Sequence, residues 1–233
     1  MRSYYPEDGN PIYQCDNFKR VYLVRYFATQ FAQSEFVIKA HILRDVKGKA
    51  DLSAVSLGGG PAPEALALIN ILSSCEGDYK LSFDNLDCEA SWEDIYHDLA
   101  HRFAKRVKNV KLKTGFNSSD VTSYVPDKQY DIVFISWMLS EIDEQERPQA
   151  VEIARDLATP QGYILVTDRL EEAVVESIST IVGGTTGLEL QGHDKVQGIY
   201  CGVSFPNDLK ELFKVRLSGD TAFWILQRRP KEF

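Results

Sequence analysis

The stretch of residues 51–71 constrains the fold more than any other part of the sequence, because it predicts a strand, a glycine turn and a helix in immediate succession. A short apolar run ends in three glycines, which accept backbone angles that a Cβ forbids. Pro61 and Pro63 follow, and proline suits a first helical turn because an N–H there lacks an intrahelical partner. Such a turn lets a ligand approach the backbone closely, which favours a nucleotide-type cofactor site. Glycine turns also close α/β chains tightly without any ligand, so the motif alone leaves both interpretations open.

The composition predicts one globular α/β domain with an extension. At 233 residues the chain can bury a substantial core, and its 44% hydrophobic and 26% charged residues are ordinary for a soluble protein. The net charge of -8 argues against a broad nucleic-acid or acidic-membrane footprint but allows a local basic patch. The cysteines lack the close spacing of a zinc ribbon or a disulfide framework; they are Cys15, Cys75, Cys88 and Cys201. With no signal-peptide core and no apolar run of membrane-spanning length, the sequence predicts a cytoplasmic protein with no membrane partner.

Residues 1–50 are predicted to form an N-terminal helical extension that caps the domain after it. The beginning is rich in Tyr, Pro, Gly and Asn and predicts an irregular lead-in. Asp16 or Asn17 can cap a helix that continues towards Ile42, with a break near residues 33–34. The many aromatic residues of this helix favour packing against the sheet over a substrate-binding wall.

Residues 51–233 are predicted to form the cofactor-binding domain. Strands and helices alternate there, which indicates a doubly wound, Rossmann-like, mostly parallel sheet. Strands after the first are predicted at 79–86, 110–116, 130–135 and 163–167, and helices after the first at 92–106, 143–158 and 168–182. The tail changes character, with strands predicted at 199–205, 213–217 and 221–227 and a turn at 218–220. The last pair predicts a C-terminal antiparallel hairpin that closes the sheet.

Acidic side chains follow the second and third predicted strands. Asp87 comes where the second strand ends, and a carboxylate there is placed to accept hydrogen bonds from ribose hydroxyls, with Asp84 as the reserve. Asp120 lies in the turn after the third strand. Each of these residues is also compatible with an aspartate that only stabilises a turn or caps a helix.

His97 and His101 lie four residues apart on the second predicted helix of the domain and share a face. With Asp98 between them, the segment superficially resembles the zinc-protease motif, in which the middle acid is glutamate. The shorter aspartate would place its carboxylate about one methylene too far from a metal-bound water, and no third ligand is evident. We therefore expect surface histidines and no metal site.

Four motifs, taken in order, are similar to those of class I S-adenosylmethionine-dependent methyltransferases. They are Ser-Leu-Gly-Gly-Gly-Pro-Ala at 56–62, Asp87, Tyr-Asp-Ile-Val-Phe-Ile-Ser-Trp-Met-Leu-Ser-Glu at 130–141, and Gln-Gly-Tyr-Ile-Leu-Val-Thr-Asp at 161–168. Each motif is loose by itself, but their order and spacing over residues 51–228 are much harder to obtain by chance. The sequence departs from the family pattern at Ser56, where the family usually carries an acid, and at Ala62, where it usually carries glycine.

The resemblance implies that the cofactor is S-adenosylmethionine. Gly58 and Gly60 would allow close approach of its methionine part. Asp87 would bind its ribose, and Asp120 would accept a hydrogen bond from its adenine amino group. The full set of expected cofactor-binding residues is Ser56, Gly58, Gly59, Gly60, Asp87, Asp120 and Ser136.

The residues of the glycine turn also favour this cofactor over a dinucleotide. A pyrophosphate requires several backbone N–H donors and a positive helix end. Pro61 and Pro63 remove two donors, and Glu64 brings a negative charge into the first turn. Because S-adenosylmethionine carries no phosphate, these residues do not oppose its binding.

Methyl transfer mainly requires that the protein align an acceptor with the activated methyl group and exclude water. Ser136, Trp137 and Glu141 follow the fourth strand, where substrates bind in this family, and are the candidate catalytic residues. Glu141 is a candidate base, although such a glutamate more often caps or pairs locally. The strand end carries neither an Asn-Pro-Pro-Tyr type segment nor a Pro-Cys pair, which disfavours amino-methylation of adenine in nucleic acid and ring methylation of cytosine.

The sequence therefore favours a methyltransferase that acts on a small molecule, with protein and RNA acceptors left open and no indication of the oligomeric state. The aromatic N-terminal segment, including Tyr4, Tyr5 and Tyr13, would then fold over the site. One alternative is a non-catalytic member of the fold that serves as a binding or assembly module, with the aromatic helix facing a partner. An NAD-binding dehydrogenase is a second, less favoured alternative.

Overall fold

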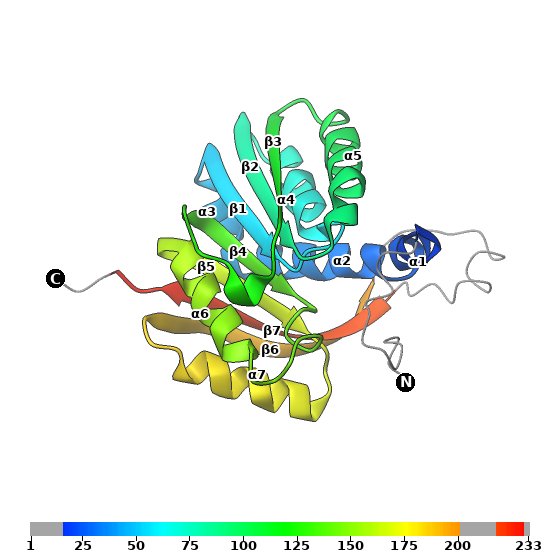
Figure 1. Cartoon of the computed structure of the whole chain (residues 1–233). Coiled ribbons are helices and arrows are strands. Elements are labelled where there is room, and N and C mark those ends of the chain that lie inside the picture. Colours follow the sequence, from blue (N-terminus) through cyan, green and yellow to red (C-terminus); the bar gives the residue numbers. More distant parts are fainter. Residues whose placement is uncertain (1–15, 201–217, 231–233) are drawn as a thin grey trace.

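The computed structural model describes residues 16–200 and 218–230, which form a seven-stranded sheet with helices on both faces (Figure 1). The strands lie in the order β3-β2-β1-β4-β5-β7-β6. Their bounds are β1 (Asp51–Leu57), β2 (Tyr79–Asp87), β3 (Val110–Ser118), β4 (Tyr130–Ser136), β5 (Ala158–Asp168), β6 (Leu188–Tyr200) and β7 (Ser218–Arg228). All neighbouring pairs are parallel except those that involve β7, which is antiparallel to β5 and β6. The predicted doubly wound, mostly parallel sheet with an antiparallel pair near its C-terminal end is confirmed.

Helices follow most of the parallel strands. The helices of the domain are α4 (Pro63–Ser73), α5 (Glu93–Ala104), α6 (Arg147–Leu157) and α7 (Glu172–Gly184), with short 3-10 helices η4 (Ala90–Trp92) and η5 (Val121–Ser123). Both α4 and α6 carry proline in the first turn, where the missing N–H has no cost. Among the described residues, no helix is both long and apolar enough to cross a membrane.

The N-terminal part is one continuous helical segment from Asp16 to Lys47. It consists of α1 (Asp16–Tyr22), α2 (Ala28–Val37) and α3 (Leu43–Lys47), joined by π-helical segments η2 (Leu23–Phe27) and η3 (Ile38–Ile42). The break expected near residues 33–34 does not occur. The apolar side of the segment is buried against α4 and β7, and its residues include Val37, Ile38, Ile42 and Val46. The segment therefore packs on the domain as its apolar residues predicted.

The two faces of the sheet bury separate apolar clusters, because successive side chains of a strand point to opposite faces. The N-terminal helical segment, α4 and α5 cover one face, and α6 and α7 cover the other. In the central strands, Leu57 is in register with Leu86 of β2 and with Ile135 of β4. The carboxyl ends of β1, β2 and β4 therefore meet at one edge, with the glycine turn between them.

Several predicted element boundaries were wrong. The helix after β4 begins at Arg147 instead of residue 143, and the helix after β5 begins at Glu172 because Asp168 still belongs to the strand. The partner of the last strand is β6, and residues 218–220 continue β7 instead of forming a turn. The polar, largely exposed β6 lacks the alternation of a half-buried strand, which explains why it was missed. The strand predicted at 213–217 lies outside the described residues, and of the strand predicted at 199–205 only residues 199–200 are described, as the end of β6.

The connection from β3 to β4 differs from the others because it contains only η5 where a helix would cover the sheet. On the opposite face α5 packs on β3, and Figure 1 shows the two elements together at one side of the molecule. Since β3 is also an edge strand, its other face is left without a helical cover.

Candidate functional site

The glycine turn after β1 adopts backbone conformations that explain its sequence. Gly58, Gly60 and Ala62 have φ values of 61°, 54° and 50°, in the left-handed region that glycine tolerates best. A Cβ on Gly58 would lie 2.7 Å from Cγ of Met138. A Cβ on Gly59 would lie 2.4 Å from Oδ1 of Asn85. Close packing around the turn therefore requires both Gly58 and Gly59, and the backbone conformation requires glycine at Gly58 as well.

Side chains from the end of β2 hold this turn in place. The Asp87 carboxylate accepts hydrogen bonds from the N–H of Gly60 (2.7 Å) and of Glu89 (2.9 Å). The Asn85 amide donates to the Gly60 carbonyl oxygen at 2.7 Å. Burial raises the pKa of Asp87, and the two N–H donors oppose that rise. Asp87 thus lies directly beside the glycine turn, and each of its oxygens keeps a lone pair for a further donor.

Glu64 places a buried carboxyl group next to the end of β1. The residue is 1% exposed, and within the described residues its Oε2 atom has no hydrogen-bond partner. Burial raises its pKa to about 7, an effect that the nearby Ser136 and Ser56 hydroxyls partly offset. Since β1 and β4 are the strands between which the order of the sheet reverses, Glu64 lies where ligands bind in open α/β sheets.

The exit of β4 contains a residue in a strained conformation. Trp137 has a φ of 60°, which is rare for a bulky side chain, and its N–H donates to the Thr167 carbonyl oxygen at 2.8 Å. Its indole N–H donates to Oε1 of Gln33, a buried residue of α2, at 2.9 Å. The N-terminal helical segment therefore contacts the strand end at which Ser136 and Trp137 were predicted to act.

Glu141, the candidate base, forms an ion pair with Arg169. The two residues follow β4 and β5, whose ends are also joined by Asp168, a buried carboxylate that accepts from the Ser140 N–H at 3.1 Å. Burial raises the pKa of Asp168, while the Ser140 groups lower it. The structure therefore contains the local ion pair that was considered for Glu141 from the sequence.

The remaining aspartates have turn and sheet roles. Asp120 is exposed and caps η5, because its carboxylate accepts from the N–H and the hydroxyl of Thr122, both at 2.8 Å. Asp84 lies inside β2 instead of at its end, and it is bound by the Tyr130 hydroxyl at 2.7 Å and by Lys128. The partners of Asp120 and Asp84 are therefore away from the glycine turn, and neither carboxylate bonds to it in the described part of the chain.

His97 and His101 lie on one face of α5, as predicted, and both contact the Thr114 hydroxyl of β3, at 2.8 and 3.3 Å. Their rings are stacked with centroids 6.0 Å apart. In the part of the chain that the structure describes, no group of three or more His, Cys, Asp or Glu side chains is arranged to hold a metal ion. The histidines thus help to join α5 to the edge strand.

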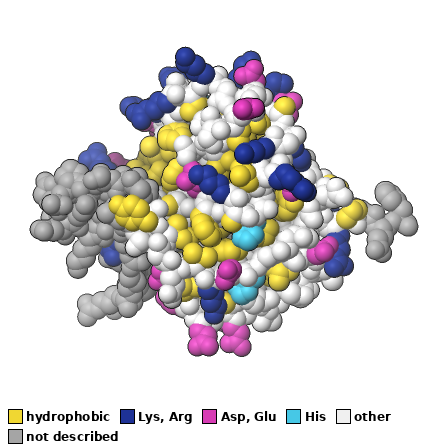
Figure 2. Space-filling model, turned by 180° about the vertical axis from the view of Figure 1, so that it is seen from behind, with side chains coloured by type: hydrophobic (Ala, Val, Ile, Leu, Met, Phe, Trp, Pro, Cys, Tyr) yellow, Lys and Arg dark blue, Asp and Glu magenta, His cyan; other side chains and the backbone are white. Residues whose placement is uncertain are grey.

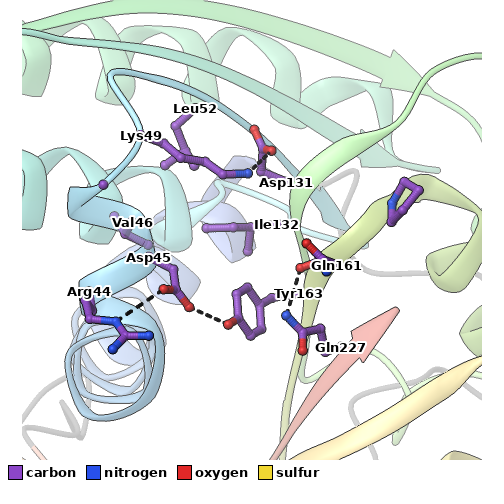
Figure 3. A pocket seen from close by; sticks show the side chains of 12 residues that line it. Arg44, Asp45, Val46, Lys49, Leu52, Asp131, Ile132, Gln161, Tyr163 and Gln227 are labelled. Carbon is purple, nitrogen blue, oxygen red and sulfur yellow. Dashed lines mark hydrogen bonds and ion pairs between the residues drawn. The ribbon is translucent and has the colours of Figure 1, made fainter. Parts of the chain in front are cut away.

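A cavity of about 440 Å³ lies at the opposite end of the strands (Figure 3). It is lined by the beginnings of β1 and β4 and by the end of the N-terminal helical segment. Its charged groups are already paired, because Lys49 binds Asp131 (2.5 Å) and Asp45 accepts from the Tyr163 hydroxyl. Because the cavity lies where β1 and β4 begin, it is separate from the edge that carries the glycine turn, where these strands end.

Sequence reasoning missed several residues that surround the turn. Asn85 continues the buried row of β2 that Leu81 and Phe83 begin, a position that the strand pattern makes visible but does not mark as functional. Glu64 was noted only for its charge in the first turn of α4, because burial cannot be read from a helix start. Gln33 belongs to a polar face of α2 that is buried, together with Thr29, Gln30 and Ser34. The signal in the sequence that could have indicated this buried polar face is the group of uncharged polar residues in α2.

No protein-family model matches the sequence, and a search of the curated proteins finds no match. Solved structures do match. Magnesium protoporphyrin IX methyltransferase from Synechocystis PCC 6803, with bound SAH, is 12% identical with a TM-score of 0.58, over 91% of this chain and 93% of that one. A SAM-dependent methyltransferase from Methanosarcina mazei is 11% identical with a TM-score of 0.58, over 84% and 98% of the two chains. The plantazolicin methyltransferase BpumL, in complex with SAH, is 11% identical with a TM-score of 0.57, over 91% and 89%.

These likenesses define the fold. The chain has the fold that is found in class I S-adenosylmethionine-dependent methyltransferases, and this is the fold that the order of the sequence motifs predicted. At such low identity the comparisons carry the architecture alone, so the activity of this chain has to be argued from its own residues.

Proposed function

We propose that the protein is an S-adenosylmethionine-dependent methyltransferase. The observation that carries the proposal is the left-handed glycine turn at the carboxyl end of β1, held beside Asp87 at the point where the strand order reverses. In the matched structures from Synechocystis and in BpumL this fold binds SAM or its product SAH.

The hydrogen bonds of the turn support this cofactor over a dinucleotide. The N–H groups of Gly58, Gly60 and Ala62 donate to Leu86 O, to the Asp87 carboxylate and to Gly59 O. Proline has no N–H, so residues 61 and 63 add no donor. Few donors of the turn can therefore face a pyrophosphate, and the buried carboxyl of Glu64 adds a negative charge where a phosphate would be repelled.

Glu64 supplies the acidic group that the family pattern places at residue 56. An ammonium group, such as that of the methionine part, would satisfy the unpartnered Oε2 atom and favour the ionised carboxylate. The Ser56 hydroxyl, which also lacks a partner within the described residues, lies close enough to lower the pKa of Glu64 and offers a second acceptor. Asp87 would bind the ribose hydroxyls with the lone pairs that its two N–H contacts leave free.

The residues at the exit of β4 would position the acceptor. The bound cofactor supplies an electrophilic methyl group, so the protein has to align the acceptor and exclude water. Trp137, fixed by Gln33 and by the Thr167 carbonyl, provides a rigid apolar wall for this purpose. Ser136 offers a hydroxyl beside it, while Glu141 is occupied by Arg169. Because the hydrogen bond between Trp137 and Gln33 holds the N-terminal helical segment against this strand end, the acceptor we propose is a small molecule.

The proposal is tested by calorimetric titration of the purified protein with S-adenosylmethionine, S-adenosylhomocysteine and NAD. We expect the first two to bind and NAD not to bind. Fractionated cell extract incubated with the protein and methyl-labelled cofactor should then yield a labelled small molecule. Saturable NAD binding without any response to the sulfonium compound would favour the dehydrogenase alternative. Cofactor binding without transfer to any fraction would favour the non-catalytic binding module.

A further inference from the structure

Exposed cations gather on β3 and on the loop before it. Residues 99–119 contain six lysine and arginine residues and no acidic residue, in a chain whose net charge is -8. Five of the six are exposed and form no ion pair with any described residue; they are Lys105, Arg106, Lys108, Lys111 and Lys113. Figure 2 shows Lys and Arg side chains, with some Asp and Glu side chains among them, along the upper rim of the molecule. We call Lys108, Lys111 and Lys113 the lysine strip.

The charges of the strip are not offset by the sheet. Lys111 is in register with Lys80 of β2, so two cations lie side by side on the same face. Like charges in directly opposed positions destabilise a sheet. Lys80 has Asp51 at 3.1 Å, but Lys111 and Lys113 have no such partner among the described residues. An anionic ligand on this face would remove the repulsion.

The row of residues that carries the strip continues into a hollow. Lys111 and Lys113 are followed at the same face by Gly115 and Asn117, which line a hollow of about 210 Å³ together with Tyr124. The face is open because the connection from β3 to β4 contains only η5. Along the floor, Asp84 is neutralised by Lys128, and a Cβ on Gly115 would lie 2.2 Å from its Oδ1 atom, so only glycine keeps the floor flat there.

We propose that the lysine strip and this hollow bind single-stranded RNA. Alternate residues of a strand are about 7 Å apart, so Lys111 and Lys113 present two cations in a line, with Lys108 in the loop before them, that can follow the phosphates of an extended strand. The Tyr124 ring lines the hollow beside the strip, where its hydroxyl donates to Asp127 at 3.2 Å, and we assign to this ring the stacking of one unpaired base. Amide and hydroxyl groups of Asn117, Ser118 and Ser119 follow at the end of β3 and suit the 2′-hydroxyl that distinguishes RNA from DNA.

The strip leads towards the edge that carries the glycine turn. The Ser119 N–H donates to the Asp87 carbonyl oxygen at 3.2 Å, so the end of β3 lies beside the residue assigned to the cofactor. RNA bound in this way would run from the loop after α5 to the carboxyl ends of the strands. The surface goes beyond the proposed methyltransferase function and does not depend on which acceptor is methylated.

The proposal is tested with a fluorescently labelled 20-nucleotide oligouridine and the full chain, by anisotropy at salt concentrations between 50 and 200 mM. In the variant K108A/K111A/K113A we expect the slope of log affinity against log salt to fall by about 2, because each phosphate contact on a single strand contributes about 0.7. Replacement of the same lysines by arginine should keep the slope. Tyr124→Ala should weaken binding by about fivefold or more, as expected for one stacked base.

The matched control is R20A/K47A/K195A, which removes the same charge from exposed positions elsewhere. Circular dichroism and calorimetric titration with S-adenosylhomocysteine establish that each variant is folded and retains the cofactor site, so a failure of RNA binding is distinguishable from a failure of the methyltransferase proposal. Salt-dependent binding lost only in the strip variant supports the proposal. No binding by the parent, an equal loss in the control variant, or equal affinity for oligodeoxythymidine would overturn it.

Discussion

The two buried carboxyl groups beside the glycine turn are held in different ways. Asp87 accepts two backbone N–H groups, whereas Glu64 keeps an oxygen without a partner in the described structure. Burial raises the pKa of both; the N–H groups of Glu89 and Gly60 oppose that rise in Asp87, and the Ser136 hydroxyl and the N–H of Glu64 oppose it in Glu64. The first residue thus stabilises the turn in the absence of any ligand, and the second has a polar atom left for one.

Asp87→Ala should weaken the binding of S-adenosylhomocysteine by on the order of 2 to 3 kcal/mol, because charge-assisted hydrogen bonds to the ribose are lost. Calorimetry would measure the difference. Asp87→Asn keeps one acceptor for the Gly60 N–H and separates loss of the ribose contact from loss of the turn. The control is His97→Ala, which leaves the turn untouched. An Asp87→Ala protein with parental affinity would contradict the ribose assignment.

Glu64→Gln should make the free protein more stable at pH 8 than the parent, by about 3 kcal/mol, and change little at pH 4.5. The folded-state pKa of about 7 lies above the ordinary glutamate pKa of 4.5, so the folded state binds more protons and the parent loses stability as the pH rises through this window. Urea unfolding at several pH values measures the effect. If the parent and variant curves run parallel from pH 4.5 to 8, Glu64 is not the buried acid inferred from its surroundings.

At the scale of elements, the turn between β1 and α4 contains the sharpest sequence requirement. Gly58→Ala should cost about 1 to 2 kcal/mol from the left-handed backbone alone, and more from the contact with Met138, with loss of cofactor binding. Gly183→Ala in α7 is the control, since nothing lies within 4 Å of its Cβ position and alanine favours a helix. Chemical denaturation of both variants checks the contrast. A destabilised Gly183→Ala or an unaffected Gly58→Ala protein would contradict this account.

The elements predicted well from the sequence were those with buried, periodic patterns. The strands β1, β2 and β4 are short runs in which buried apolar residues are continuous or alternate. Their existence and order could therefore be predicted from the sequence. Helix starts were displaced where capping turns resemble helices, as at residues 143–146. Glu64 and Gln33 could not be placed at the site, because their burial depends on packing between elements distant in sequence. The assignment of residues to the cofactor remains a prediction for the whole set, which is Ser56, Gly58, Gly59, Gly60, Asp87, Asp120 and Ser136.

At the scale of the whole molecule, the alternation of strands and helices predicted the sheet correctly, and the comparisons agree with its architecture. The antiparallel end of the sheet was predicted in kind but not in its residues. There β6 is mostly exposed, and pairing with β7 decides its conformation more than its own pattern does. The division at residue 50 between an extension and a domain stays a prediction, and residues 4, 5 and 13 lie outside the described chain.

The strand β7 completes the surface on which the N-terminal helical segment packs. Gln33 of α2 donates to the Asp220 carbonyl oxygen across 187 positions of sequence, and a Cβ on Gly219 would collide with Thr29. A ribosome that adds about 5 to 20 residues per second makes β7 on the order of ten seconds or more after α2. During synthesis α2 therefore lacks this contact until β7 has been made, and Gln33, which also binds Trp137, gains its hydrogen bond to Asp220 only then.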